Sequence, residues 1–187
     1  MNAPIDISRV QLETARLILR PWKESDLEDF YTYARIDGVG EMAGWPHHQS
    51  IEDSRQVLHI FMEGRHTFAI VLKDTGKAIG SLGLDASSAA DEADFQPLSC
   101  CEIGYVLRKD FWGRGLMPEA VQAALMYCFD DLKLDAIFCS HFKRNSRSRR
   151  VIEKCGFQYL RDIQYTTRCG TIEPSMCYVH FRPDISK

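Results

Sequence analysis

The stretch CEIGYVLRKDFWGRGLMPEA, which runs from Cys101 to Ala120, carries the strongest structural signal in this chain. Residues 103–107 are apolar and suit a strand, and a charged turn leads from them to Gly113 and Gly115. A helix is expected to follow, because Pro118 suits the first turn of a helix, where a missing N–H is no loss. A strand, a glycine-bracketed loop and a helix start predict a site for a phosphorylated ligand, since exposed N–H groups there attract anions.

Two common phosphate-binding motifs do not fit this loop. A dinucleotide-binding G-x-G-x-x-G fingerprint needs glycine or alanine where the chain has Pro118. A Walker A loop needs Gly-Lys followed by Ser or Thr after a four-residue spacer, and Gly115 is followed by Leu116. Taken alone, the loop is therefore either a tight turn or a site for another class of phosphorylated ligand.

Composition indicates an ordinary globular protein. The 187 residues are 45% hydrophobic and 26% charged, which is enough for one domain with its own core. The formal net charge of -3 does not favour a nucleic-acid partner. Neither a signal-like N-terminus nor a membrane-spanning apolar run is present. Seven cysteines without a C-x-x-C motif are expected to be reduced packing residues, so we expect a cytoplasmic protein.

Periodicity and turn residues predict one α/β (α+β) domain over residues 1–187, with a core of about 12–182. The polar, acidic segment 86–99 is expected to be a mobile surface loop. The expected strands are 12–21, 66–72, 77–84, 101–107, 134–142, 157–168 and 172–182, and the expected helices are 26–35, 50–62, 116–130 and 145–155.

This order of elements resembles the GNAT superfamily of N-acetyltransferases, and the resemblance covers nearly the whole chain. Local sequence words resemble its RimJ/RimL-like branch, which includes enzymes that acetylate N-terminal amines of ribosomal proteins. These words are LETARLILR at 12–20, GWP at 44–46, EIGY at 102–105, WGRGL at 112–116, NSRS at 145–148 and EKCGF at 153–157. Asp110 departs from the pattern, which has Gln or Arg there. The resemblance implies a mixed, largely antiparallel sheet of about seven strands, about four helices and splayed central strands.

The same resemblance implies that the chain binds acetyl-coenzyme A as co-substrate and needs no metal. Backbone amides of the glycine loop would hold the pyrophosphate, and the strand 101–107 would pair with the pantetheine arm, leaving an N–H near Val106 for the oxyanion. The donor-binding residues implied in this way are Tyr105, Val106, Leu107, Trp112, Gly113, Arg114, Gly115, Leu116, Met117, Asn145, Ser148 and Arg149.

Glu102 is the candidate general base. Strand alternation puts Glu102, Gly104 and Val106 on one face, and a carboxylate with a raised pKa suits removal of a proton from an ammonium. The plainer alternative is a solvent-facing glutamate at a strand start. His141 is the rival base, because the ordinary pKa of histidine is already near 7.

Ser148 is the candidate acid, since the resemblance places the serine of N-x-x-S near the thioester sulfur. Many GNAT enzymes have a tyrosine one turn later, where this chain has Ile152. Ser148 would therefore either protonate the thiolate or only position it. Helix capping by Asn145 and Ser146 is the plainer interpretation of the same motif, and it is compatible with the chemical one.

Trp45 is expected to line or cover the acceptor pocket, because the loop between the first two helices shapes that pocket in this fold. His47 and His48 adjoin it, but sequence neighbours rarely chelate one metal together, so no metal site is expected. The basic run 143–150 is interpreted as a solvated helix face with one or two arginines near the coenzyme.

Three functions remain open at this point. The first is acetylation of a protein N-terminal amine, and the second is acetylation of a small amine such as a polyamine, amino acid or antibiotic. The third is a coenzyme A-binding module without turnover. We expect an amine partner, no membrane partner, and a monomer or homodimer.

Overall fold

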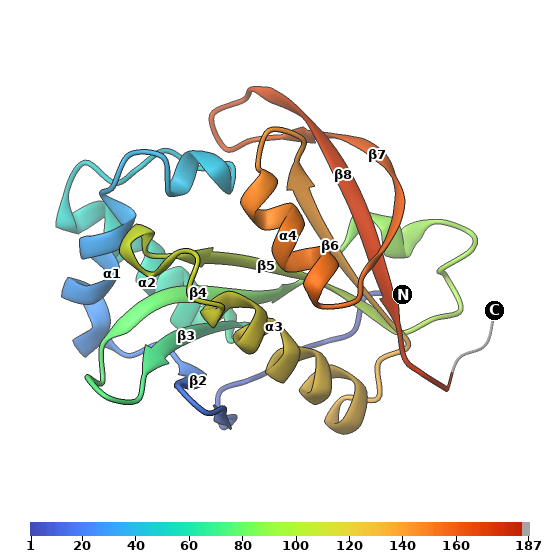
Figure 1. Cartoon of the computed structure of the whole chain (residues 1–187), viewed down its shortest axis with the longest axis horizontal. Coiled ribbons are helices and arrows are strands. Elements are labelled where there is room, and N and C mark those ends of the chain that lie inside the picture. Colours follow the sequence, from blue (N-terminus) through green and yellow to red (C-terminus); the bar gives the residue numbers. More distant parts are fainter. Residues whose placement is uncertain (185–187) are drawn as a thin grey trace.

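One open sheet of eight strands organises the computed structural model, which describes residues 1–184 (Figure 1). The spatial order is β1-β2-β3-β4-β5-β6-β8-β7. The strands are β1 (Leu12–Glu13), β2 (Leu17–Pro21), β3 (Thr67–Leu72), β4 (Ala78–Asp85), β5 (Cys100–Leu107), β6 (Ala136–Phe142), β7 (Gln158–Thr166) and β8 (Ile172–Phe181). All neighbours are antiparallel except β5 and β6.

Strands β5 and β6 separate in the middle of this sheet. They pair in parallel only from Cys100 to Glu102, which faces Phe138. Beyond Glu102, β5 stays paired with β4 as far as Leu107, while β6 continues with β8 (Figure 1). The expected splay of the central strands is confirmed, and it opens one side of β5.

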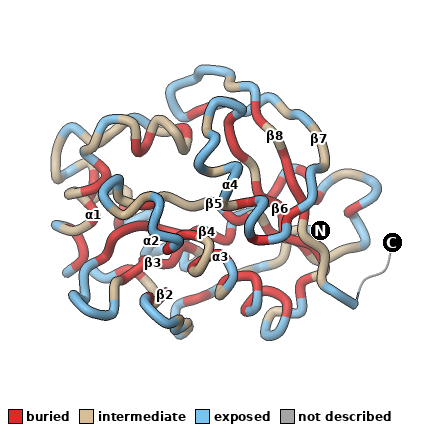
Figure 2. The backbone as a smooth tube through the Cα atoms, viewed as in Figure 1, coloured by how far each residue is buried: buried red, intermediate tan, exposed pale blue. Residues whose placement is uncertain are grey.

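Two pairs of helices cover the two faces of the sheet. Alternate side chains of β3 point to opposite faces: Ala69 packs toward α1 (Leu27–Ala34) and α2 (Ile51–Gly64), and Ile70 belongs to the core beneath α3 (Leu116–Met126). The fourth helix, α4 (Ser146–Lys154), adds Ile152 to the core beneath α3. Buried positions accordingly run along the central strands in Figure 2.

Two local expectations are wrong. The expected strand 12–21 is broken by a turn at Thr14–Arg16, so that β1 folds back on β2 with Leu12 facing Leu19. The segment 86–99 is not purely a surface loop, because Ala90 and Phe95 are buried and form a third core cluster with Phe138. Small and aromatic side chains in an otherwise polar segment provide that anchorage.

Six of the seven cysteines are buried and all seven are free thiols. Their expected role as packing residues is therefore confirmed. Within residues 1–184, no helix is long and apolar enough to cross a membrane.

Candidate active site

The glycine loop presents free backbone N–H groups to the open side of β5. Gly113 and Gly115 have φ angles of 78° and 75°, in the left-handed region that favours glycine. Gly115 is the N-cap of α3 and makes no side-chain cap, so the first N–H groups of the helix stay available. The side chains of Leu116 and Met117 are buried, which leaves their backbone as the part that a ligand can reach. This arrangement suits an anion.

Arg16 holds the loop in place from the turn between β1 and β2. Its Nη1 donates to the carbonyl of Arg114 at 2.9 Å, and its Nε donates to Glu119 Oε2 at 2.7 Å. Glu119 also accepts from the backbone N–H of Arg16 at 2.9 Å. Two segments almost a hundred residues apart in the sequence are thus in contact. The turn that breaks the first strand places Arg16 where it makes this contact.

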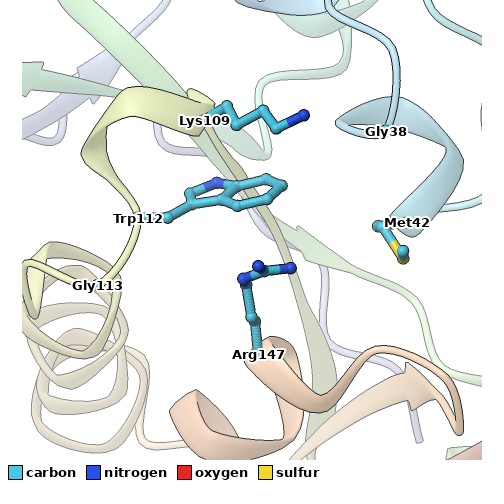
Figure 3. A pocket seen from close by; sticks show the side chains of 6 residues that line it. All are labelled: Gly38, Met42, Lys109, Trp112, Gly113 and Arg147. Carbon is cyan, nitrogen blue, oxygen red and sulfur yellow. The ribbon is translucent and has the colours of Figure 1, made fainter.

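A cavity of about 550 Å³ lies beside the glycine loop (Figure 3). Lys109, Trp112 and Arg147 stand along one side of it, and Met42 lies opposite (Figure 3). The Arg147 guanidinium is 4.9 Å from the Trp112 ring centroid, and Trp112 Nε1 donates to the carbonyl of Leu107 at 2.7 Å. Two cations next to free N–H groups make this cavity suitable for a phosphorylated ligand.

Of the arginines that the sequence indicated, Arg147 lines this cavity, whereas Arg114 and Arg149 have other partners. Arg114 stacks on the ring of Phe111 at 5.1 Å, and Arg149 Nε donates to Glu153 Oε1 at 2.7 Å. Within residues 1–184, neither of these two arginines lines the cavity. Arg147 belongs to the basic run that the sequence singled out, whereas nothing local distinguishes Lys109.

Glu41 shapes the far wall of the cavity by closing the loop after α1. Its carboxylate accepts from the N–H of Gly38 at 2.8 Å and lies 2.7 Å from His47 Nδ1. Burial raises the pKa of Glu41, but hydrogen bonds from His47 and Gly38 outweigh it and bring the pKa to about 2. Asp37, Glu41 and His47 place three ligand atoms within 4.8 Å of one another. His48 turns away to Ser54 Oγ at 2.7 Å, so the adjacent histidines diverge.

Trp45 packs inward from the same loop. A Cβ at Gly40 would lie 2.3 Å from its ring, and the ring centroid of His48 is 5.3 Å away. The glycine is therefore required for this packing. Met42 lines the cavity beside the glycine loop, and the expected place of Trp45 at the acceptor pocket stays a prediction.

Glu102 lies on the face of β5 that α1 and α2 cover, where β5 leaves β6. Ser87 Oγ accepts from the N–H of Ala89 at 3.3 Å, so its own hydrogen is directed to Glu102 Oε2 at 2.8 Å. Burial raises the pKa of Glu102, and hydrogen bonds from Ser87 and Ser140 oppose that rise. A carboxylate with a raised pKa is suited to proton removal.

Asp85 is a second carboxylate on this face and stands opposite Glu102 across the strand pair. Its Oδ1 lies 3.1 Å from His66 Nε2. A Cβ at the exposed Gly104 would lie 3.6 Å from Asp85 Oδ2, so the glycine leaves space over the strand. Asp85, Ser87 and His66 could not be recognised from the sequence. Strand register places Asp85 opposite Glu102, the fold of the segment after β4 brings Ser87 to Glu102, and His66 contacts Asp85.

His141 lies on the opposite face of the sheet. Its side chain is buried, Nδ1 donates to the carbonyl of Phe142 at 2.8 Å, and Nε2 is 3.4 Å from the Tyr178 hydroxyl. Burial lowers the pKa of His141. The two candidate bases are thus separated by the sheet, and a group that meets Glu102 does not meet His141.

Ser148 meets an unexpected partner, the side chain of Tyr105. The two hydroxyl oxygens are 2.9 Å apart, on the face of β5 opposite to Glu102. From the sequence, only the backbone of Tyr105 was expected to contact the donor. The N–H of Ser148 also donates to Asn145 Oδ1 at 3.1 Å, which confirms the expected N-cap of α4.

Pairing with β4 determines which N–H groups near Val106 are free. Arg108 N–H donates to the carbonyl of Ile79 in β4 at 2.8 Å. Because successive N–H groups of a strand point to opposite sides, that of Val106 also points to β4. The N–H groups of Tyr105 and Leu107, on either side of Val106, therefore face the gap beside β6.

Hydrogen bonds bridge the gap at its outer end. Asn145 Nδ2 donates to the carbonyl of Met42 at 3.1 Å, and Arg144 donates to the carbonyl of Glu41 at 3.0 Å. Nearby, the N–H of Arg168, in the β7–β8 turn, donates to the carbonyl of Gly44 at 2.8 Å. The loop between α1 and α2 is thus joined to the C-terminal half of the chain.

Comparisons with known proteins agree with this geometry. Residues 16–158 match the family model of the acetyltransferase (GNAT) domain. The chain is 31% identical to the uncharacterized N-acetyltransferase YoaA of Bacillus subtilis, over 92% of this chain and 97% of that protein. A GNAT-family acetyltransferase from Bacillus anthracis superposes with a TM-score of 0.81 at 22% identity, covering 94% of this chain and all of that one. A ribosomal-protein-S5-alanine acetyltransferase from Vibrio fischeri superposes with a TM-score of 0.70 at 20% identity, covering 95% of this chain and 100% of that one.

Proposed function

The chain belongs to the GNAT family of acetyl-coenzyme A-dependent N-acetyltransferases, and from this premise we propose that it acetylates the N-terminal amine of a protein. The observation that carries the proposal is the division of β5 into two chemical faces. Glu102 stands on one face, and the hydroxyl groups of Tyr105 and Ser148 stand on the other. The acceptor and the departing thiolate need these opposite environments.

In this proposal the coenzyme enters at the cavity beside Trp112, with its phosphates toward the start of α3, Lys109 and Arg147. Its thioester lies in the gap beside β5, where the N–H of Tyr105 or Leu107 faces the developing oxyanion. Glu102 removes a proton from the acceptor ammonium on the other face, directly or through water. The amine then attacks the thioester carbonyl, and the C–S bond breaks.

The name of the ribosomal-protein acetyltransferase from Vibrio fischeri supports a protein acceptor. A small primary amine is the second candidate, and the contact between Arg168 and Gly44 is compatible with it. That contact narrows the approach to Glu102, so it admits a small amine or an extended chain end more readily than a side chain of a folded domain.

The test is release of free thiol from acetyl-coenzyme A with a panel of acceptors. The panel contains peptides that begin with Ala, Ser or Met, the same peptides with a blocked N-terminus, spermidine and free amino acids. We expect turnover with the unblocked peptides only. Turnover confined to spermidine or amino acids would favour the second candidate, and no turnover with any amine would refute both.

The Glu102→Gln variant tests the assigned base. We expect kcat to fall by roughly 10²–10⁴, with unchanged affinity for coenzyme A. Glu63→Gln, a change at an exposed position of α2, is the matched control and should behave like the wild type. An unaltered kcat for Glu102→Gln would contradict the assignment.

A further inference from the structure

Tyr105 and Ser148 form a pair of hydroxyl groups between β5 and the start of α4. One turn after Ser148 the helix carries Ile152, which is fully buried in the core and has no polar atom. Tyr105 reaches the same helix from β5 instead. Its hydroxyl oxygen lies 2.9 Å from Ser148 Oγ and 3.1 Å from the carbonyl oxygen of Ser148.

The hydrogens of this pair have two arrangements. The carbonyl of Ser148 can only accept, so in the first arrangement it takes the hydrogen of Tyr105, and the Ser148 hydroxyl donates to Tyr105 Oη. In the second, Tyr105 donates to Ser148 Oγ, and the hydrogen of Ser148 is free to turn outward. Both arrangements use the same oxygen positions, so the change needs only rotation of two hydroxyl hydrogens.

Tyr105 stays a donor throughout. Burial raises the pKa of Tyr105 well above its ordinary value, and the hydrogen bond with Ser148 opposes this rise only in part. A donor that bonds to Ser148 Oγ leaves the single hydrogen of the Ser148 hydroxyl free to turn to an anion. Tyr105 supplies that donor.

We propose that Tyr105 is a positioning residue that directs the Ser148 hydroxyl toward the departing thiolate of coenzyme A. This inference rests on the proposed function. As the C–N bond forms and the C–S bond breaks, the thiolate leaves with the electron pair of the C–S bond. Ser148 donates a hydrogen bond to it, and Tyr105 donates one to Ser148. No proton leaves either side chain.

A double-mutant cycle tests the coupling. Ser148→Ala should lower kcat by about tenfold or more, as expected for loss of a hydrogen bond to a charged group. Tyr105→Phe loses a bond between two neutral hydroxyl groups and should lower kcat by roughly three- to tenfold. The double variant should be no slower than Ser148→Ala, because Tyr105 acts through Ser148. Tyr159→Phe is the matched control, since its hydroxyl donates to Asp162 on β7. Wild-type kcat for Tyr105→Phe, or multiplicative effects in the double variant, would overturn the proposal.

A second measurement does not depend on turnover. The ratio of the Kd of desulfo-coenzyme A to that of coenzyme A, measured by calorimetry, should increase with pH in the wild type as the bound thiol ionises. Tyr105→Phe should flatten this increase while leaving the affinity for desulfo-coenzyme A unchanged, which also shows that the variant is folded. The same pH dependence in both proteins would overturn the role of Tyr105. Failure of every acceptor amine would instead count against the proposed function.

Discussion

Removing the Asn145 side chain should destabilise the protein in two separable parts. Asn145 Oδ1 caps α4 by accepting from the N–H of Ser148, and Nδ2 donates to the carbonyl of Met42 across the gap. An N-cap contributes typically about 1 kcal/mol, and a further hydrogen bond about 1 kcal/mol. The change Asn145→Ala should therefore cost about 2 kcal/mol. For a chain of this size, this lowers the melting temperature by roughly 4–8 °C.

The variant Asn145→Ser separates the two contributions. Serine is a good N-cap residue but is too short to replace the donor to Met42, so about half of the loss should return. Thermal denaturation followed by circular dichroism measures all variants. Ser146→Ala, at the exposed first position of the helix, is the control and should melt like the wild type. Equal destabilisation by Asn145→Ser and Asn145→Ala would refute the assigned capping role.

Three further predictions concern the base and the donor site. Ser87→Ala removes a hydrogen bond that favours ionised Glu102, so the pKa of Glu102 should rise further. The acid limb of the kcat/KM profile should then move to higher pH, while the plateau at high pH stays unchanged. Gly113→Val and Gly115→Val should each abolish coenzyme A binding in calorimetry, because valine is strained at positive φ, whereas Arg114→Ala should bind nearly normally. Coenzyme A and desulfo-coenzyme A at a hundredfold excess over Kd should stabilise by about 2.7 kcal/mol and raise the melting temperature by roughly 5–11 °C. NADH should have far less effect; no shift with any coenzyme A species would refute donor binding.

Features encoded by neighbouring residues could be predicted from the sequence. The strand at 101–107, the glycine loop and the start of α3 depend on local periodicity and on positions that only glycine tolerates. Strand alternation also separates Glu102 from Tyr105, as the hydrogen bonds of the structure confirm. The family resemblance then supplied the arrangement of these elements in the sheet.

Features that depend on contacts between distant segments could not be predicted. Ser87 reaches Glu102 because 86–99 folds back onto the sheet, and its polar composition concealed the buried Ala90 and Phe95. The first strand breaks because Arg16 must meet Glu119, which is more than a hundred residues away. Local periodicity contains no information about either contact.

Backbone direction limited the prediction of the oxyanion donor. Alternation of side chains identifies which residues share a face, but the side to which an N–H points depends on the pairing partner. The bond from Arg108 to Ile79 settles that orientation and identifies the free N–H groups near Val106 as those of Tyr105 and Leu107. Pairing register therefore added what composition and motif could not.

The two chemical faces of β5 also have a consequence for how acceptor choice changes during evolution. In the proposed site, positions 102 and 104 border the acceptor, while positions 103 and 105 face α3 and α4, on the side proposed for the donor. Interleaved positions of one short strand thus encode two independent properties. A lineage can exchange its acceptor through alternate substitutions in β5 and changes in the loops above it, without rebuilding the coenzyme site. Laboratory selection for new amines should accordingly concentrate its mutations on even-numbered positions.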